Sequence, residues 1–185
     1  MHSRIGSRRS ISHVRVAGRT PEHARQFVSE TVGASAIPIE AVENIEAAVR
    51  VADIIVTATS SPTPVIAREW LRSGAHLNAV GASRPMHSEI DARTVADAIL
   101  VTDRRESLEA EAGDYRQAVA DGVIRGPDAA AELGELLTGK RSGRTSAGQL
   151  TMFRSLGLGI EDLAAAEHVL AKALETGAGV TVAAP

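Results

Sequence analysis

The sequence of 185 residues contains no cysteine, and aromatic residues account for only 2% of it. Without cysteine the chain forms neither disulfides nor thiolate metal sites, and the expected location is cytoplasmic. With so few aromatics, a core must consist of Ala, Val, Ile and Leu, which suits helices packed on a parallel sheet. The length is typical of one domain. The composition therefore favours a single α/β domain.

Strong charge and long apolar segments are also scarce. The net charge of -3 gives no indication of a nucleic-acid or membrane partner. No run approaches the ~18 apolar residues of a membrane span, and no apolar secretory segment opens the chain. The six histidines show no metal-ligand spacing, and His87–Glu89 is interpreted as a surface turn. We therefore expect a small-molecule partner and no metal.

A glycine-rich phosphate loop is missing too. A dinucleotide-binding fold normally opens with a strand and a Gly-x-Gly-x-x-Gly/Ala turn, whose glycines let the backbone approach the pyrophosphate. No such motif occurs in this sequence. Arg4–Arg9 contains one glycine and follows no strand. Thr138–Arg144 is basic and glycine-rich, but it lacks the Gly-Lys-Ser/Thr order of a P-loop and is interpreted as a solvated turn.

Two apolar runs that end in small or hydroxylic residues are the most informative feature present. The first lies within Asp53–Pro64 and the second within Gly74–Pro85. Such runs are typical of buried parallel strands, and ligands bind in the crevice outside the carboxyl ends of such strands. Hydroxyl groups follow the first run and small residues follow the second. The two ends therefore predict one wall of a dinucleotide cleft.

Strands and helices alternate along the chain, as in a parallel sheet built from βαβ units. Thr20 is the expected N-cap of the first helix, with Pro21 at its first position. The predicted strands are 12–17, 36–39, 53–57, 75–80, 98–102 and 150–154. The predicted helices are 21–32, 40–51, 66–71, 108–120, 128–137 and 159–176.

Six ordered motifs make the chain resemble the ornithine cyclodeaminase and mu-crystallin family of nicotinamide-dependent amino-acid and imine enzymes. The resemblance covers about 14–176. It implies an α/β, Rossmann-like NAD(P)-binding domain with a parallel sheet whose first βα unit is missing. The motifs are Val14–Thr20, Val56–Ser60, Asn78–Pro85, Glu111–Asp114, Glu132–Glu135 and Phe153–Gly157.

The resemblance also implies a domain organisation. We expect a remnant segment over 1–13, a Rossmann-like domain over 14–158, a C-terminal helix over 159–177 and a flexible tail over 178–185. The upstream part of the family, which carries its substrate-binding Arg and Lys and much of its homodimer surface, matches no positions here. We interpret the chain as a fragment; the alternative is a shortened protein without the ordinary activity.

The expected cofactor is NADPH rather than NADH. NAD sites place a carboxylate at the end of the second strand, whereas NADP sites place a cation there. Arg19 and Thr20 occupy this position, and no carboxylate precedes Glu22. In the mu-crystallin branch, the resemblance implies that this Arg and Thr bind the extra phosphate. The resemblance assigns further cofactor contacts to Thr57, Ala58, Thr59, Val80, Gly81 and Ser155.

Two substrate-facing positions follow from the same resemblance. Glu111 matches a carboxylate that faces the ligand pocket, and Ser83 stands where ornithine cyclodeaminases have an aspartate that exchanges protons. A serine hydroxyl cannot serve as that base near pH 7. We therefore expect NADPH-dependent reduction of cyclic imines to cyclic amino acids, with the catalytic residues unassigned. The alternatives are an ornithine cyclodeaminase or amino-acid dehydrogenase, and a non-catalytic cofactor- or ligand-binding fragment.

Overall fold

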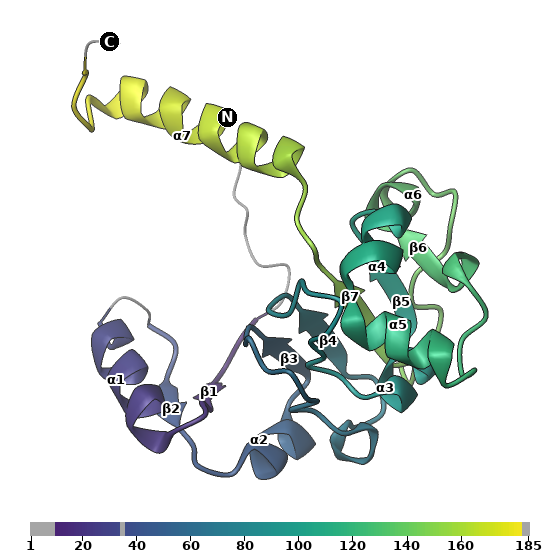
Figure 1. Cartoon of the computed structure of the whole chain (residues 1–185). Helices are drawn as coiled ribbons and strands as arrows, with labels where there is room; N and C mark the ends of the chain where they lie inside the picture. Colours follow the sequence, from purple (N-terminus) through teal and green to yellow (C-terminus); the bar gives the residue numbers. More distant parts are fainter. Residues whose placement is uncertain (1–9, 34–35, 183–185) are drawn as a thin grey trace.

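The computed structural model describes residues 10–33 and 36–182, which form seven strands, seven α-helices and two short 3-10 helices (Figure 1). The expected remnant at 1–13 and the end of the tail lie partly outside these residues. The strands are β1 (Val14–Val16), β2 (Ile39–Ala41), β3 (Ile54–Thr57), β4 (His76–Ala79), β5 (Ile99–Thr102), β6 (Ala130–Glu132) and β7 (Thr151–Arg154). The helices are α1 (Pro21–Thr31), α2 (Ile45–Val51), η1 (Arg68–Trp70), α3 (Ala92–Asp97), α4 (Arg105–Glu111), α5 (Gly113–Ala120), η2 (Pro127–Ala129), α6 (Leu133–Leu137) and α7 (Gly159–Thr176).

Five of the strands form one parallel sheet in the order β3-β4-β7-β5-β6. Alternate residues of its strands point to opposite faces. One face is buried along a cross-strand row in which Leu77 pairs with Ile55 and Met152, and Met152 pairs with Leu100. Helices α2, α3, α4 and α5 contribute residues to the same core. The parallel α/β architecture is thereby confirmed.

The core is aliphatic, as the composition predicts. Tyr115 is its one buried aromatic residue within the described chain, and the single tryptophan, Trp70, packs against it from η1. The opposite face of the sheet is less covered: Ile54 and Val56 on β3 are 39% and 61% exposed. Parallel sheets are normally covered on both faces, so this exposure at the edge strand is unusual.

A separate unit consists of β1, α1 and β2. The two strands pair in parallel with each other and with no strand of the larger sheet. Pro21 begins α1 and Thr20 is its N-cap residue, as expected, although the Thr20 side chain makes no capping hydrogen bond. Ala24 is the only buried residue of α1, and Phe27 is exposed. This unit therefore buries little apolar surface.

Helix α7 contains no buried residue, and Figure 1 shows it projecting away from the body of the molecule. Its exposed apolar residues are Ile160, Leu163, Val169, Leu170 and Leu174. No helix of the described chain is long and apolar enough to cross a membrane.

Several predicted elements were wrong in detail. The expected helix 108–120 is two helices, because the chain breaks at Ala112 to bring Gly113 against the carbonyl of His87. The expected helix 128–137 is divided into the end of η2, strand β6 and helix α6. Ala130–Glu132 is a strand because it pairs with β5, and tertiary pairing overrides helix propensity. Residues 40–41 belong to β2, and 66–71 contains only η1. Helix α3 was not expected.

Candidate functional site

The carboxyl ends of β3 and β4 are joined by one buried carboxylate, Glu89. Its side chain is completely buried and accepts four hydrogen bonds. The Thr57 hydroxyl donates at 3.1 Å, and the backbone N–H groups of Gly81 and Ala82 donate at 2.9 and 3.2 Å. The Thr59 N–H donates to the other carboxylate oxygen. Charge-assisted bonds of this kind are stronger than neutral ones, so Glu89 fixes both loops.

The two loops also touch directly. A Cβ added to Gly81 would lie 2.1 Å from the Thr59 nitrogen and 2.3 Å from its oxygen. Real Cβ atoms do not approach backbone atoms this closely, so the contact requires glycine. The segment that follows β4 therefore packs directly against the segment that follows β3. Together with Glu89, this contact makes a rigid ledge, which we define as residues 57–59 and 80–82.

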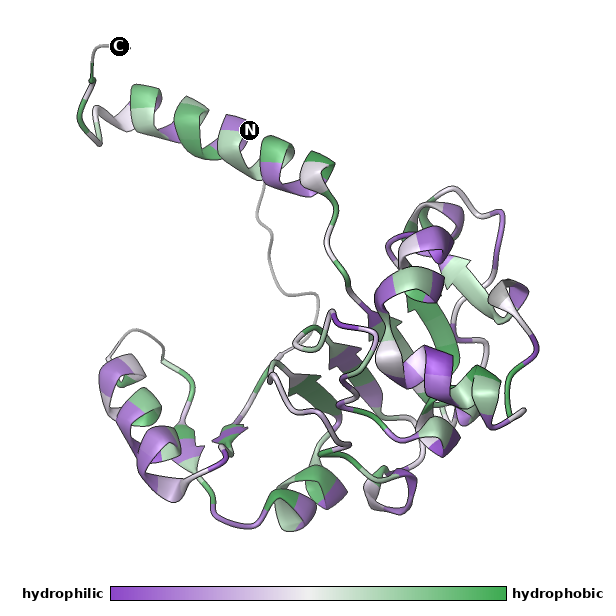
Figure 2. Ribbon diagram, viewed as in Figure 1, coloured by the Kyte–Doolittle hydropathy of each residue, from purple (hydrophilic) through white to green (hydrophobic). Residues whose placement is uncertain are grey.

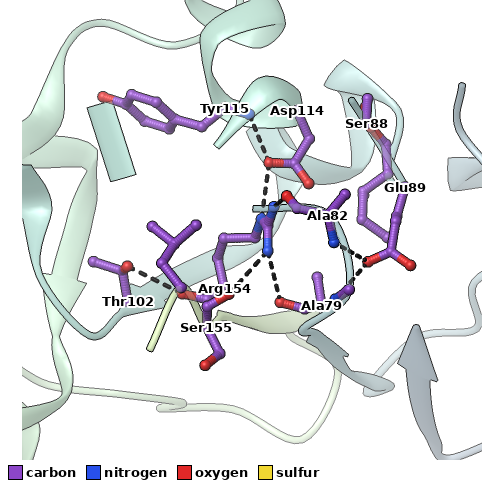
Figure 3. A network of polar contacts seen from close by, with 12 residues as sticks. Ala79, Ala82, Ser88, Glu89, Thr102, Asp114, Tyr115, Arg154 and Ser155 are labelled. Atoms are coloured by element: carbon purple, nitrogen blue, oxygen red, sulfur yellow. Dashed lines mark hydrogen bonds and ion pairs between the residues drawn. The ribbon is translucent and has the colours of Figure 1, made fainter. Parts of the chain in front are cut away.

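A second buried charge, Arg154, lies at the carboxyl end of the central strand β7 (Figure 3). Its Nε donates to Asp114 at 3.0 Å, and both side chains are buried. Its Nη1 donates to the carbonyls of Ala79 and Ser155, each at 3.0 Å, and its Nη2 donates to the carbonyl of Ala82. Arg154 therefore ties the ends of β4 and β7 to helix α5.

Burial raises the pKa of the Asp114 carboxyl, and this effect outweighs the opposing influence of Arg154. One of its oxygens, Oδ2, has no hydrogen-bond partner among the described residues. The N–H of Tyr115 donates to the other oxygen at 2.9 Å. The pair thus combines a direct ion contact with incomplete hydrogen bonding, which is costly in a buried site.

Asp103 performs a related task where β5 ends. Its Oδ2 accepts from the N–H groups of Leu156 and Gly157 at 2.6 and 2.8 Å. The Ser155 hydroxyl donates to the same oxygen at 3.3 Å. The other oxygen, Oδ1, is buried without a partner in the described part of the chain. Asp103 therefore fixes the loop that follows β7 and holds Ser155 at the carboxyl edge of the sheet.

The structure brings most of the predicted cofactor residues to this edge. Thr57 is buried with its hydroxyl on Glu89, whereas Ala58 and Thr59 are exposed beside it. The Val80 side chain is 42% exposed on the ledge, next to Gly81. These residues lie at one edge because β3, β4, β7 and β5 are parallel, so the carboxyl ends of the strands meet there.

Arg19 and Thr20 lie apart from the ledge, in the loop between β1 and α1. The Arg19 side chain is exposed, whereas the Thr20 hydroxyl is buried and has no hydrogen-bond partner among the described residues. An orphaned buried hydroxyl is uncommon, and it is consistent with a polar group that binds there. The structure therefore places the two parts of the predicted site in different units of the fold.

The predicted substrate residues lie near the network without belonging to it. Ser83 is exposed directly after the buried Ala82. Glu111 is half-buried at the last position of α4, rather than within one helix over 108–120 as expected. In the described residues, no group of three or more His, Cys, Asp and Glu side chains has the arrangement of a metal site.

Sequence reasoning missed four buried charged residues. The interpretation of His87–Glu89 as a surface turn was wrong for Glu89, which is fully buried. A signal existed: two strand ends leave N–H groups without strand partners, and such groups require an acceptor. For the pair Arg154 and Asp114, 40 residues apart in sequence, no local pattern indicates contact. The fourth residue is Asp103.

Comparisons with known proteins agree with this geometry. The sequence profile described as the ornithine cyclodeaminase/mu-crystallin family matches residues 3–177. The chain belongs to this family. A Delta(1)-pyrroline-2-carboxylate reductase of Bacillus cereus is 37% identical over 176 residues, which are 92% of this chain and 53% of that protein. Ketimine reductase mu-crystallin of Mus musculus is 38% identical over 160 residues, 86% of this chain and 47% of that protein.

Solved structures of the family have the same fold. Thermococcus litoralis Delta(1)-pyrroline-2-carboxylate reductase, in complex with NADH and L-proline, has a TM-score of 0.85 and 35% identity, and the match covers 92% of this chain and 53% of that one. An archaeal alanine dehydrogenase dimer with bound NAD has a TM-score of 0.81 and 33% identity, covering 94% and 53%. The chain thus spans about half the length of these relatives, and its five-stranded sheet corresponds to an NAD(P)-binding, Rossmann-like domain.

Proposed function

We propose that this chain forms the cofactor-binding part of an NADPH-dependent reductase that converts cyclic ketimines to cyclic amino acids. The observation that carries the proposal is the ledge at the carboxyl ends of β3 and β4, fixed by the four hydrogen bonds to Glu89. Ligands of open parallel sheets bind outside this edge. A relative that is 37% identical is named as a Delta(1)-pyrroline-2-carboxylate reductase, and one that is 38% identical is named as a ketimine reductase.

The residues present fit a nicotinamide dinucleotide. Val80 offers an exposed apolar side chain on a ledge whose backbone is held in place, which suits a flat ring. Ser155 stands at the same edge with its hydroxyl directed to Asp103. Arg19 and the orphaned hydroxyl of Thr20 offer a charge and a hydrogen bond to a phosphate. The fit thus involves both units of the fold.

A nicotinamide cofactor, when bound, supplies a hydride to the imine carbon. The chain's own residues would bind the cofactor and orient the cofactor and the imine. The ledge would fix one face of the site, and Asp103 would keep the Ser155 hydroxyl and the following loop in place. Ser83 would contact the substrate without acting as a base, because its hydroxyl is un-ionised near pH 7. A protonated imine is already electrophilic and needs no such base for hydride addition.

The preference for NADPH is carried by the β1–α1 loop. Arg19 is exposed there, and the nearest following carboxylate, Glu22, lies 3.3 Å from Arg25. A guanidinium binds a phosphate bidentately, whereas a carboxylate would repel it. Two related structures contain NADH or NAD, in contrast to the preference that we propose for this chain.

A second candidate function is binding of the cofactor without catalysis. The chain spans about half the length of its relatives. Cyclodeamination and amino-acid oxidation remain alternatives within the family, and Ser83 disfavours the former. A reduction assay with a cyclic imine such as Delta(1)-pyrroline-2-carboxylate distinguishes a reductase from a binding module.

Calorimetric titration of the purified chain with NADPH and NADH tests the proposal. We expect NADPH to bind at least about tenfold more tightly than NADH, because a charge-assisted phosphate contact contributes about 1.5–3 kcal/mol. Arg19→Ala should abolish the difference and leave NADH binding unchanged. Arg72→Ala is the matched control, since Arg72 is an exposed arginine that pairs with Asp53 before β3, at the opposite edge of the sheet.

Equal affinity of the unaltered chain for the two nucleotides would reject the NADPH preference and leave the reductase proposal in place. Failure of either nucleotide to bind a chain with native circular dichroism would reject cofactor binding by this chain alone. Binding without turnover of the imine would favour the non-catalytic candidate.

A further inference from the structure

Ser155 is held by a hydrogen bond at each of its polar groups. Its N–H donates to the Ala79 carbonyl at 3.0 Å, and its own carbonyl accepts from Nη1 of Arg154 at 3.0 Å. Its hydroxyl lies 3.3 Å from Oδ2 of Asp103. Backbone and side chain are both restrained, so the hydroxyl has a fixed position at the carboxyl end of β7.

Asp103 follows β5 directly, at the end of a strand that Figure 2 shows as hydrophobic. The residue is only 7% exposed. Three donors converge on its Oδ2, namely the N–H groups of Leu156 and Gly157 at 2.6 and 2.8 Å and the hydroxyl of Ser155. A buried carboxyl group needs such donors in place of water. The hydrogen bonds of Asp103 are therefore made to the loop that follows β7.

The two backbone donors determine the direction of the hydroxyl bond. An N–H group can only donate, so Oδ2 of Asp103 is the acceptor for Leu156 and Gly157. An oxygen that accepts from both carries no proton of its own, and a proton on Oδ1 would not change this. The Ser155 hydroxyl therefore donates to Oδ2, in a bond that is charge-assisted when the carboxyl group is ionised.

This direction leaves Ser155 Oγ with lone pairs only. A hydroxyl has one proton to donate and two lone pairs that accept. Because the proton is directed to Asp103, Oγ presents an acceptor and no donor to a ligand. Ser155 is half-buried, and Figure 3 shows its hydroxyl on the side away from the Arg154 guanidinium group.

Strand register places this acceptor beside the ledge. Ala79 pairs with Arg154 across β4 and β7, so Val80 and Ser155 are the next residues on two neighbouring strands. Neighbouring strands lie about 4.8 Å apart. A flat ring that packs on the exposed Val80 side chain therefore has Ser155 at its rim.

The nicotinamide ring carries a group that matches this acceptor. Its carboxamide has an NH2 group that donates and a carbonyl oxygen that accepts. An Oγ that only accepts pairs with the NH2 group and repels the carbonyl oxygen. Turning the ring over would move the carboxamide away from Ser155, so the same bond selects which face of the ring meets the ledge.

We propose that Asp103 is a positioning residue that determines the polarity of Ser155. It takes the hydroxyl proton, so that Ser155 Oγ accepts a hydrogen bond from the carboxamide NH2 group of the cofactor. The resulting property is selectivity for a carboxamide over a group of the same shape that has no N–H. This inference rests on the proposed function, because it requires a nicotinamide dinucleotide at the ledge.

Calorimetric titration with NADP+ and two analogues tests the proposal. In 3-acetylpyridine adenine dinucleotide phosphate a methyl group replaces the NH2 group, and in nicotinic acid adenine dinucleotide phosphate an oxygen replaces it. We expect the acetyl analogue to bind about tenfold more weakly than NADP+, because Ser155 Oγ loses its donor. The nicotinic acid analogue should bind more weakly still, because it brings a negative charge to the lone pairs of Oγ and to Asp103.

Two substitutions separate this role from a structural one. Ser155→Ala removes the acceptor, so NADP+ should bind about tenfold more weakly while the acetyl analogue binds unchanged. Asp103→Asn keeps an acceptor oxygen for the N–H groups of Leu156 and Gly157, but its bond to the hydroxyl is neutral and about half as strong. The hydroxyl can then donate to the acetyl carbonyl. We expect the acetyl analogue to gain affinity, so that its deficit relative to NADP+ falls to about threefold or less.

Asp53→Asn is the matched control. Asp53 is an exposed aspartate that pairs with Arg72 before β3, at the opposite edge of the sheet. The substitution removes the same charge as Asp103→Asn and should leave the affinities for all three nucleotides unchanged.

Equal binding of NADP+ and the acetyl analogue by the unaltered chain would overturn this inference and leave the proposed function in place. Equal weakening of both nucleotides by Asp103→Asn, with their ratio preserved, would show that Asp103 is structural only. Ser155→Ala tests the acceptor by itself, so a folding defect of the Asp103 variant, detected by circular dichroism, leaves the test intact. Failure of all three nucleotides to bind the folded, unaltered chain would reject the proposed function and this inference with it.

Discussion

The five-stranded sheet and the β1–α1–β2 unit both consist of parallel strands, but they bury very different amounts of apolar surface. The sheet has a continuous aliphatic core and buried charged residues that form hydrogen bonds between strand ends, although one oxygen each of Asp103 and Asp114 has no partner among the described residues. The smaller unit buries only Ala24 of its helix and is held by exposed ion pairs such as Arg15 with Glu40. Exposed pairs contribute little to stability.

This difference means that the rigid part of the candidate site and the part that would recognise the cofactor's phosphate lie in different units. The ledge belongs to the well-packed sheet, whereas the residues that would choose between the two nucleotides belong to the weakly packed unit. Segments with few buried apolar contacts open at low free-energy cost. We therefore expect cofactor selectivity to depend on whatever fixes the smaller unit, and catalytic geometry to depend on the sheet.

Of the substitutions considered, replacement of Arg154 should lower the free energy of unfolding most. Arg154→Met leaves Asp114 buried without its cation and removes the Arg154 donors from the carbonyls of Ala79 and Ala82, of which Ala79 keeps the Ser155 N–H. Breaking a buried pair in this way costs about 3–5 kcal/mol. Urea unfolding followed by circular dichroism should show this decrease in the free energy of unfolding.

Arg104→Met is the matched control for that experiment. Arg104 pairs with Glu106 on the surface, where both side chains are more than half exposed. The change should alter the free energy of unfolding by less than about 1 kcal/mol. Equal effects of the two substitutions would show that the Arg154 network does not stabilise the sheet.

Replacement of Gly113, at the start of α5, should give the next largest loss of stability. A Cβ at Gly113 would lie 2.1 Å from the His87 carbonyl oxygen and 2.8 Å from that of Pro85. Both are backbone atoms, so Gly113→Ala forces the helix away from the loop and should cost about 2–3 kcal/mol.

Gly134 in α6 provides the opposite expectation for the same substitution. No atom lies within 4 Å of a Cβ added there. Gly134→Ala should therefore stabilise the protein by about 0.5–1 kcal/mol, because alanine favours a helix. Thermal unfolding of both variants compares them directly, and destabilisation by both would contradict the clash at Gly113.

A smaller effect is expected when the ledge loses its carboxylate. Glu89→Gln replaces one acceptor oxygen by an amide group that faces backbone N–H donors of Gly81 and Ala82 or of Thr59. We expect a cost of about 2 kcal/mol and faster amide exchange at these residues. Glu106→Gln, at an exposed side chain, should change neither property.

The smallest expected effect is a pH dependence of the free energy of unfolding that is caused by Asp114. Its pKa is raised by burial, so from the ordinary aspartate value, about 3.9, up to the raised value, the folded protein keeps a proton that the unfolded chain has lost. The free energy of unfolding should therefore fall as pH rises through this window. Asp114→Asn should flatten the slope; an unchanged slope would assign it to other groups.

The sheet was predictable because apolar runs with β-branched residues identify β3 and β5 locally, and β4 lies in the run that ends in the small residues after Val80. The edge strand β6 was not, since Ala130–Glu132 contains residues of good helix propensity and becomes a strand only by pairing with β5. At the site, the strand ends were predictable from their small and hydroxylic residues. The buried charges were not, because Arg154 and Glu89 acquire their partners from segments distant in sequence.

Trp70 gives the molecule a built-in optical label. It is the only tryptophan, and it packs against the core of the five-stranded sheet, whereas the β1–α1–β2 unit contains no tryptophan or tyrosine. Intrinsic fluorescence excited at the indole therefore reports on the sheet and is silent about the smaller unit. An emission transition at higher denaturant concentration than the loss of helical signal would show that helices outside the sheet, such as α1 and α7, unfold before the sheet does.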